Sequence, residues 1–399
     1  MKLLYVYGNS KSISGSDVIQ ALKNIGYETD VYPNLMENVE RLNDDEVDAL
    51  TAYISEHAID CIVSIHFILN ASLASYKTGV KYISVIWDSP YLCFYNVLGR
   101  LDNLWVSTFD KLDRERFLQN GVKHVLYQPL SINDKNLMEW SHDIQETLQG
   151  NYIHDISFIG NLYDKSNGYD LLVDKIPVNI QYYFNSIFEE AAFKWDGVNR
   201  IYGKTGQEML DYIKLVSPEF AFPNRQDVED VLYFENICLV RKIANIERIA
   251  VLNLLAENHN VTLYTGSQEN AEKMLHNVNI GPPVETGKAT ALVFAGSKIN
   301  LNISLKGIEG GTPQRIMDVM GAGGFVLSSY CEETAELFEE NKEIVFFRTP
   351  EELLEKVDYY LAHDMERRQI ARAGYEKVIN CYTYEKKMKE LLEWVEKEE

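Results

Sequence analysis

Short apolar runs alternate with amphipathic stretches over roughly the first 130 residues of the chain. The runs that predict strands are "LLYVYG", "CIVSIHF", "YISVIW", "LWVST" and "KHVLY". Asn70 and Gly79 are suited to begin and end one intervening helix, and Asp110 and Gly121 another. Strands without polar alternation that are separated by helices are typical of a parallel sheet covered on both faces. The pattern therefore predicts a doubly wound, Rossmann-like α/β domain over residues 1–135.

The same pattern returns later in the chain, after polar sequence from about Ser131 to Tyr152 that we interpret as a linker. "DISFIGN" repeats the theme of a strand followed by glycine, and further strands are predicted at "VTLYTG", "INLNIS", "GFVLSS" and "EIVFF". These runs predict a second α/β domain over residues 153–380. An aromatic-rich stretch at about 180–257 predicts a helical elaboration within it.

Two further features concern the C-terminal part of the chain. Thr349 and Glu352 flank Pro350 as a capping box for a helix. Residues 381–399 predict a C-terminal amphipathic helix.

Composition and charge restrict the function. The 399 residues are 46% hydrophobic and 25% charged, as in an ordinary globular protein, and the formal net charge is −22. Nucleic acid is a poor partner, because phosphate-backbone binding requires clustered lysine and arginine. A small phosphorylated ligand is compatible with this charge, since a few buried cationic or N–H groups suffice.

The cysteines and the N-terminal sequence predict a cytoplasmic protein. The five cysteines contain no CxxC pair, which favours buried reduced thiols. The first residues form a strand and turn rather than a signal peptide, and no apolar run approaches the roughly 20 residues of a membrane span.

The segment with the clearest candidate chemistry is "INLNISLKGIEGGTPQRIMDVMGAGGFVLSS". Its glycines, Gly310 and Gly311, precede a helix that Thr312 can cap. Backbone N–H groups and the positive end of the helix dipole would form an anion site for a diphosphate, and Arg315 would add a forked donor. The alternative is an ordinary loop in which Arg315 and Asp318 form only an i,i+3 ion pair.

Other candidate residues follow predicted strands. Because ligands of parallel sheets lie at the carboxyl ends of the strands, His66 and Asp88 can point into one cleft. Asp88 could orient an acceptor hydroxyl or act as its general base, and His66 could bind either substrate. The alternatives are an Asx-type turn at Asp88 and a hydrogen-bonded histidine at a strand end.

The remaining candidates are weaker signals. Gly8 and Asn9 follow the first strand, and Gly160 and Asn161 stand where a donor phosphate could approach. Lys306 is a second phosphate ligand or a solvated lysine, and Arg248 is expected to face solvent or to form a structural ion pair. Topology alone predicts that a nucleobase would lie near loops at the sheet edge, within 265–267 and 279–285, with Gly266, Ser267 and Gly281 as candidates.

The sequence resembles the group 1-like glycosyltransferases, in the branch of the spore maturation protein CgeB. The resemblance rests on "INLNIS", "GTPQRIMDVMGAGGF" and "YYLAHDMERRQIARAGYEKV" in the second domain, and on "YISVIWDSPYL", "FDKLDRERFLQNGVKHVLYQPLSIN" and "ISFIGNLY" before them. It implies a GT-B fold, with two Rossmann-like domains facing a central cleft. It also implies a retaining sugar transfer that needs no metal ion and no cofactor.

The family pattern carries over unevenly. In the related enzymes two acidic residues eight positions apart contact the donor sugar and its ribose. Asp318 matches the second, as a ribose ligand. Gly310 stands at the position of the first, and Glu309 is one residue away. Asp88 occupies the place of a familiar histidine near the reacting carbon.

These observations lead to one preferred hypothesis and to alternatives. A nucleotide-sugar donor, with a UDP-sugar favoured, would give its sugar to a hydroxyl of a glycan, a protein or a surface polymer. The alternatives are a nucleotide-sugar 2-epimerase and a non-catalytic coat-associated protein of the same fold. An NAD-dependent enzyme is disfavoured, because no GxGxxG fingerprint follows the first strand. The sequence leaves the oligomeric state open.

Overall fold

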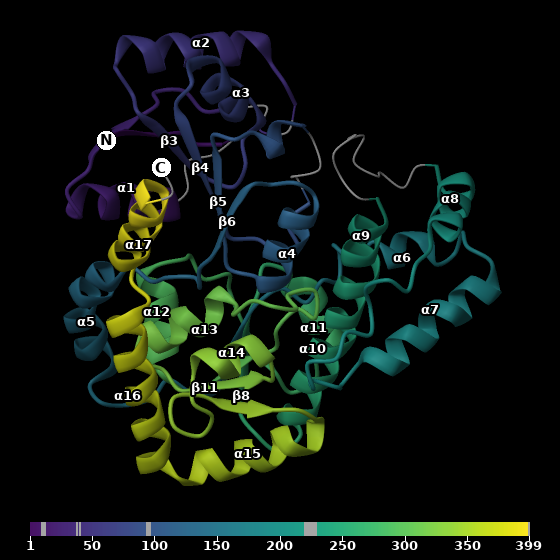
Figure 1. Ribbon diagram of the computed structural model, residues 1–399. Helices are drawn as coiled ribbons and strands as arrows, with labels where there is room; N and C mark the ends of the chain where they lie inside the picture. Colours follow the sequence, from purple (N-terminus) through teal and green to yellow (C-terminus); the bar gives the residue numbers. More distant parts are fainter. Residues whose placement is uncertain (9–12, 37–38, 40, 93–96, 219–229, 398–399) are drawn as a thin grey trace. The chain divides into compact units, whose positions relative to one another are not determined.

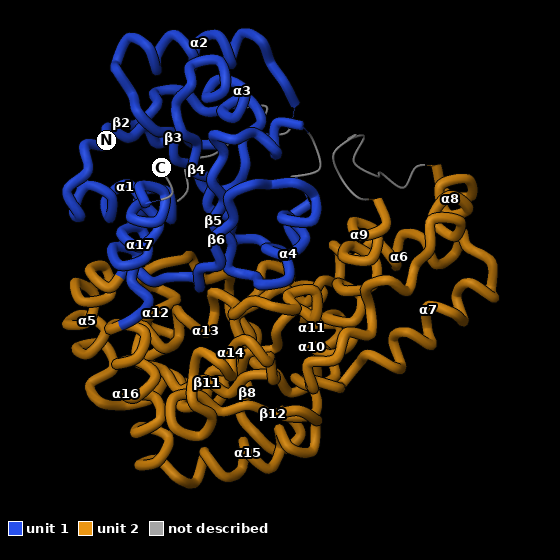
Figure 2. The backbone as a smooth tube through the Cα atoms, in the orientation of Figure 1, with its two compact units in different colours: residues 1–133, 225–229, 381–399 blue, residues 134–224, 230–380 orange. Residues whose placement is uncertain are grey.

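The computed structural model describes the chain except for residues 9–12, 37–38, 40, 93–96, 219–229 and 398–399 (Figure 1). The chain forms two compact units, which Figure 2 distinguishes by colour. Of the described residues, unit 1 comprises those within 1–133 and 381–399, and unit 2 those within 134–224 and 230–380. Each unit has its own sheet and is described separately.

Unit 1 contains a six-stranded parallel sheet in the order β2-β1-β3-β4-β5-β6. Its strands are β1 Lys2–Tyr5, β2 Glu28–Val31, β3 Cys61–Ile65, β4 Lys81–Ile86, β5 Leu104–Thr108 and β6 His124–Tyr127. Its helices are α1 Ile13–Asn24, α2 Asp44–Glu56, α3 Leu69–Thr78, α4 Lys111–Gln119 and α17 Tyr384–Lys397, with a 3₁₀ turn at Val97–Arg100. The five strands predicted from apolar runs are confirmed. β2 was not predicted, because its sequence "ETDV" is mostly polar.

The helix ends of unit 1 test the capping predictions. Asp110 caps α4, since its side chain accepts hydrogen bonds from the N–H groups of Leu112 and Asp113. Gly79 ends α3 in a left-handed conformation. The prediction for Asn70 was wrong: α3 begins after Ile68, and Asn70 lies inside the helix, where its amide donates to Glu46 (2.7 Å).

Unit 2 contains a second six-stranded parallel sheet in the order β12-β11-β10-β7-β8-β9. Its strands are β7 His154–Ile159, β8 Val261–Tyr264, β9 Asn279–Gly281, β10 Ser297–Asn302, β11 Val326–Ser329 and β12 Val345–Phe347. The predicted strands of this unit are confirmed. Residues 279–281, predicted as loop, instead form the short edge strand β9 beside β8.

The helices of unit 2 cover its sheet and form a separate apolar cluster. They are α5 Asp134–Leu148, α6 Tyr169–Leu172, α7 Val178–Ala191, α8 Gln207–Val216, α9 Asp230–Phe234, α10 Arg241–Ala256, α11 Gln268–Met274, α12 Lys288–Ala295, α13 Gln314–Gly321, α14 Glu332–Leu337, α15 Pro350–Ala362 and α16 Asp364–Cys381. A π-helical segment, Glu235–Val240, joins α9 to α10. Side chains of α6 to α9 form their own apolar cluster, whereas the second half of α10 packs into the core of the sheet.

Three sequence expectations have outcomes here. The polar stretch interpreted as a linker forms the helix α5, because its apolar side chains are spaced for one helical face. The side chain of Thr349 caps α15 with Pro350 in the first turn, as predicted. Glu352 does not complete the capping box, since it accepts from the N–H of Arg348 (2.7 Å).

The C-terminal helix α17 belongs to unit 1. Its apolar stripe (Met388, Leu391, Leu392 and Val395) is buried in one cluster with Tyr5, Val18 and Trp105. Cys61, Cys238 and Cys331 are buried free thiols, as predicted, Cys381 is half-buried, and Cys93 lies outside the described residues. No helix in the described part of the chain is long and apolar enough to cross a lipid bilayer.

Candidate functional site

The loop after β10 leads into α13 and provides the first part of the site. α13 begins at Gln314, one residue later than predicted, and no side chain caps it. Thr312, the predicted cap, is turned inward instead, since its hydroxyl donates to Glu333 (2.7 Å) and contacts Thr334 (3.1 Å). Gly310 and Gly311 are buried just before it. The positive end of the α13 dipole is therefore not capped by a side chain of its own.

Arg315, in the first turn of α13, is half-buried and lacks a counter-ion. Its guanidinium lies 5.2 Å from the centre of the Phe294 ring. Within the described part of the chain it has no hydrogen-bond or ion-pair partner. Burial lowers its pKa, against the opposing charge of Asp318. The i,i+3 ion pair considered as the alternative is not formed; the carboxylate of Asp318 accepts instead from the amide of Gln314 (2.7 Å).

Asp318 lies one turn further along α13 and is half-buried. Burial raises the pKa of its carboxyl, while the hydrogen bond from Gln314 and the charge of Arg315 act in the opposite direction. The structure thus places a carboxylate near Arg315 without pairing the two groups.

Arg248 on α10 is a second arginine close enough to Arg315 for their charges to interact. The prediction that it faces solvent or forms an ion pair was wrong. Arg248 is only 8% exposed, and it forms no ion pair with any residue that the structure describes. It donates to the carbonyl oxygens of Asn161 (2.5 Å) and Ile303 (2.8 Å), which follow β7 and β10. Its Nε is buried with no hydrogen-bond partner. The reason for the error is that the helical pattern of α10 does not reveal that two strand ends converge on this side chain.

The ends of β7 and β10 bring these groups together. β7 and β10 are adjacent and parallel, so the loops that follow them lie at the same edge of the sheet. Burial lowers the pKa of Arg248, and the charge of Arg315 acts in the same direction. A β-carbon added to Gly160 would lie 2.9 Å from the Phe158 ring and 3.7 Å from Nη1 of Arg248, so glycine permits this close approach. Two guanidinium groups without a carboxylate partner, beside a helix N-terminus, form an arrangement suited to an anion.

Lys306 and Glu309 lie on the loop after β10 and line one pocket. Lys306 is not solvated: its ammonium pairs with Glu247 (3.1 Å), donates to the carbonyl of Ala191 (2.8 Å) and lies over the Trp195 ring. Burial lowers the pKa of Lys306. Glu309 is half-buried at the pocket wall, and the buried Nε1 of Trp195, also in this wall, has no hydrogen-bond partner. The pocket wall therefore combines apolar surface with the carboxylate of Glu309 and the indole N–H of Trp195.

The residues expected near a nucleobase lie at the edge of the same sheet. Gly281 ends β9 and pairs with Tyr264 at the end of β8. A β-carbon at Gly281 would lie 2.5 Å from the Tyr264 ring. Gly266 is exposed, and Ser267 immediately precedes α11, with no hydrogen bond from its side chain to the helix end. The carboxyl ends of β8 and β9 thus bring these residues to one edge of unit 2.

In unit 1 the structure brings His66 and Asp88 together. They follow the adjacent strands β3 and β4, and His66 Nε2 lies 3.4 Å from a carboxylate oxygen of Asp88. The His66 ring stacks on Tyr91 (5.4 Å between centroids), and its Nδ1 is buried with no hydrogen-bond partner. Burial lowers the pKa of His66, and the charge of Asp88 acts in the opposite direction. His66 has a left-handed backbone (φ 60°), a strained conformation for a non-glycine residue.

The loop after Asp88 rests on two buried carboxylates that the sequence did not single out as functional. Asp110 accepts from the hydroxyl of Ser89 (2.6 Å), and Asp113 accepts from the N–H of Tyr91 (2.9 Å). Burial, with the nearby charge of Asp110, raises the pKa of Asp113 to about 7. The spacing of two acids at the start of α4 was the available signal. Gly8 lies after β1, where an added β-carbon would be 3.1 Å from the side chain of Val39, and Asn9 lies outside the described residues.

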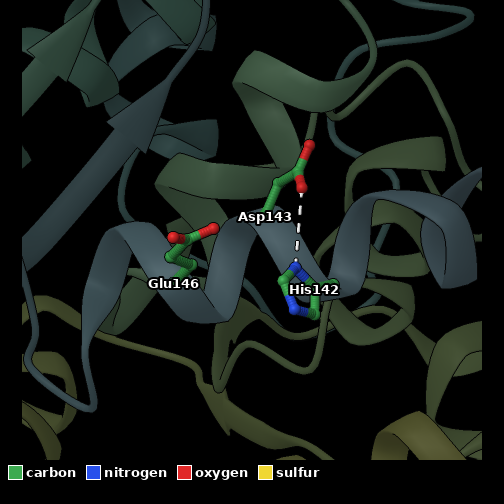
Figure 3. A group of neighbouring side chains, drawn as sticks. All are labelled: His142, Asp143 and Glu146. Carbon is green, nitrogen blue, oxygen red and sulfur yellow. Dashed lines mark ion pairs between the residues drawn. The ribbon is translucent and has the colours of Figure 1, made fainter.

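Among the described residues, His142, Asp143 and Glu146 form the group whose ligand atoms lie close enough to hold a metal ion (Figure 3). All three are exposed on α5. Asp143 contacts His142 (3.7 Å) and forms an ion pair with Lys288. The hydrogen bond from Lys288 lowers the pKa of Asp143. The group is explained by surface ion pairing, and we assign it no metal.

The two units, each a parallel sheet with flanking helices, define an α/β architecture of the GT-B class. Sucrose-phosphate synthase from Thermosynechococcus elongatus has this fold, with a TM-score of 0.57 and 10% identity over 100% of both chains. Anabaena Alr3699/HepE in complex with UDP-glucose gives a TM-score of 0.54 and 10% identity over 100% of both chains. A UDP-GlcNAc 2-epimerase from Neisseria meningitidis, bound to UDP-GlcNAc, gives a TM-score of 0.50 and 12% identity over 98% of this chain and 99% of the epimerase chain.

At the level of sequence, residues 246–393 match the family described as glycosyl transferase-like. The match begins in α10, just before Arg248, and contains Glu309, Arg315 and Asp318. A comparison with curated protein sequences gives no match.

Proposed function

We propose that the protein transfers a hexose-type sugar from a nucleotide-diphosphate donor, with a UDP-sugar favoured, to an acceptor hydroxyl. The observation that carries the proposal is the pair Arg248 and Arg315 at the carboxyl ends of β7 and β10, neither of which has a carboxylate partner among the residues that the structure describes. The family match, which includes both residues, and the GT-B fold support it.

Unit 2 binds the donor in this proposal. Arg315, the loop of Gly310, Gly311 and Thr312, and the N-terminal end of α13 hold the diphosphate, with Arg248 and the Gly160–Asn161 turn on its other side. Charge develops on the diphosphate as the glycosidic bond breaks. Fixed guanidinium and N–H groups aimed at that charge stabilise the transition state. Asp318 accepts hydrogen bonds from the ribose, and the base lies near Gly266, Ser267 and Gly281.

The donor sugar occupies the pocket lined by Glu309, Trp195 and Lys306. Glu309 and the unpaired indole N–H of Trp195 are polar groups of the kind that orient sugar hydroxyls. Lys306 fixes the pocket wall through Glu247 rather than binding phosphate.

Unit 1 presents the acceptor, which is a glycan, a protein or a surface polymer. Asp88 orients the acceptor hydroxyl or takes its proton, and the imidazole of His66 positions the Asp88 carboxylate. In a transfer with retention the hydroxyl attacks from the face of the leaving group, and the departing phosphate takes its proton. The two arginines neutralise the leaving group in this scheme, so a chelator such as EDTA is expected to leave the rate unchanged.

A 2-epimerase is the second candidate, since the neighbour from Neisseria meningitidis has the same fold. The two activities differ in what they do to a donor alone. An epimerase converts it to the 2-epimer, whereas a transferase leaves it intact or hydrolyses it slowly.

The test is a panel of UDP-, GDP- and dTDP-sugars, first screened by thermal shift and then incubated with and without acceptors. A tight ligand raises the melting temperature by mass action. Release of the nucleoside diphosphate together with a glycosylated acceptor supports transfer. An epimer formed from donor alone supports the second candidate. Binding without turnover over the whole acceptor panel would favour a non-catalytic protein, and a chain that binds no nucleotide sugar would overturn the proposal.

A further inference from the structure

A second cavity in unit 2 lies at the opposite end of its sheet. Its walls are α5, the turn after α13 and α16, and its volume is about 610 Å³. These helices lie on one side of unit 2 (Figure 2). The floor is formed where β7, β10 and β11 begin, at Tyr152, Ser297 and Phe325. The arginine pair described above lies where β7 and β10 end. The cavity therefore lies at the amino ends of the strands, and the arginine pair lies at their carboxyl ends.

The charge of this cavity, which we call the α5–α16 groove, is unusual for the protein. Its lining contains Lys298, Arg367, Arg368 and Arg372 and no acidic side chain. The chain as a whole carries a formal net charge of −22, so a cationic surface stands out against the average. A concave region lined by one sign of charge concentrates ligands of the opposite sign.

The acidic partners of these cations lie outside the lining. Asp364 serves both Arg367 and Arg368, so one carboxylate is shared by two guanidinium groups. Lys298 pairs with Asp155 (2.6 Å), and the exposed Arg372 pairs with Glu376 (2.9 Å). The groove therefore has one cation more than the acids that neutralise it.

Arg367 adds an observation that points to a ligand. It is 1% exposed and donates to the carbonyl of Tyr360 (2.6 Å), but its Nε is buried without a hydrogen-bond partner. Its guanidinium and that of Arg368 lie 5.2 and 5.0 Å from the centre of the Tyr152 ring. A buried donor without a partner costs free energy unless a ligand or water satisfies it.

Three carbonyl groups at the end of α13 are already hydrogen-bonded within the turn that follows it. Those of Asp318, Val319 and Met320 accept from the N–H groups of Ala322, Gly324 and Gly323. The other wall, α5, contributes the apolar side chains Leu137, Ile144 and Leu148 together with Ser141 and Gln145. The groove thus has a cationic side and an amphipathic side.

We propose that the α5–α16 groove binds a phosphate monoester of the size of a sugar phosphate or a nucleotide. Its phosphate would lie at Arg367, Arg368 and Arg372, and its uncharged part along α5. Several guanidinium forks match the three oxygens and double charge of a phosphate better than a single carboxylate. A volume of about 610 Å³ is in the range of pockets that hold such ligands. The proposal is independent of the function proposed for the arginine pair.

The test uses the full-length chain and isothermal titration at low salt, with glucose 6-phosphate, UMP and inorganic phosphate as probes. Arg368→Gln/Arg372→Gln removes two exposed cations of the groove. Lys342→Gln/Lys389→Gln removes two exposed, acid-paired lysines elsewhere and is the matched charge control. Arg315→Ala reports on the other anion site.

We expect at least one ester to bind with a stoichiometry of one. The groove double variant should weaken this binding by about tenfold or more, while the lysine control and Arg315→Ala leave it unchanged. Comparison of glucose 6-phosphate with UMP shows which ester is preferred. The proposal is overturned if neither ester binds, if the lysine control weakens binding as much as the groove variant, if Arg315→Ala abolishes it, or if no variant changes it.

Discussion

Arg315→Ala separates a binding arginine from a structural one. Arg315 is half-buried and has no carboxylate or carbonyl partner among the described residues, so it adds little to the stability of the free protein. If it binds the donor diphosphate, its removal should weaken UDP binding strongly and change the stability little.

The structure sets the size of both effects. A hydrogen bond to a charged group contributes about 1.5–3 kcal/mol, so loss of the contact should raise the Kd for UDP by about 10- to 150-fold. On the stability side, the substitution removes the contact with Phe294, about 0.5–1 kcal/mol, and also the cost of burying an unpaired charge. These terms oppose one another. The melting temperature should therefore stay within about 4 °C of the wild type.

The assay combines calorimetric titration with UDP and thermal unfolding without ligand. Arg116→Ala is the control, because Arg116 pairs with the buried Asp113 (3.0 Å) in unit 1. This variant should unfold at lower temperature and bind UDP like the wild type. The reasoning fails if Arg315→Ala binds UDP as tightly as the wild type, or if it loses binding only because it unfolds.

Three further predictions test other parts of the molecule. Asp88→Asn should lower the rate of sugar transfer by about 10²- to 10³-fold and leave the Kd for UDP unchanged, as initial rates and titration would show; an equal rate would remove Asp88 from the chemistry. The pKa of Asp113 is raised to about 7, so the folded state holds a proton between about pH 4 and 7 that the unfolded state releases. As the pH rises through this window, the wild type should therefore lose stability relative to Asp113→Asn, by up to about 1.4 kcal/mol per unit of pKa shift. The prediction is contradicted if the urea midpoints of the two proteins change by the same amount between pH 5 and pH 7.5. Gly374→Ala, inside α16, should destabilise the protein by about 1–3 kcal/mol despite the higher helix propensity of alanine, because the new β-carbon would lie 2.6 Å from the carbonyl oxygen of Glu343; a rise in melting temperature would show that the backbone yields.

The sheets were predictable because their strands are buried on both faces. Apolar runs such as "CIVSI" and "LWVST" identify such strands without reference to the rest of the fold. The two strands that were missed, β2 and β9, lie at sheet edges, where burial is partial and the sequence is more polar. Helix ends were predicted where one local contact decides them, as at Asp110. They were missed at Asn70 and Thr312, because tertiary partners occupy those side chains.

The candidate site was only partly predictable for the same reason. His66 and Asp88 were found because both follow adjacent strands and topology places such residues at one edge. Arg248 was missed because it is about 90 residues from Gly160 and lies in the middle of a helix, with no local feature to distinguish it. Arg248 is buried because β7 and β10 are adjacent in the sheet and because carbonyl groups that follow both strands accept hydrogen bonds from it. This arrangement is a tertiary one that the local sequence does not reveal.

The unpaired arginines also predict a conflict between stability and binding. The chain has 60 acidic residues against 38 basic ones, so a counter-ion for Arg248 would be easy to supply. Asn161→Asp supplies one with almost no change in shape. The Asn161 side chain accepts from the N–H of Tyr163 (2.6 Å), and its carbonyl accepts from Arg248. A carboxylate would keep the first contact and add a negative charge beside the guanidinium.

Asn161→Asp should therefore raise the melting temperature by about 2–4 °C, equivalent to about 1 kcal/mol, and weaken UDP binding by about tenfold or more through repulsion of the diphosphate. Asn43→Asp is the matched control, since Asn43 also accepts a backbone N–H, that of Glu46 (3.2 Å), but belongs to unit 1, whereas the arginine pair belongs to unit 2. It should leave UDP binding unchanged. If Asn161→Asp neither stabilises the chain nor weakens binding, then the charge of Arg248 is compensated in another way and the guanidinium pair does not hold an anion.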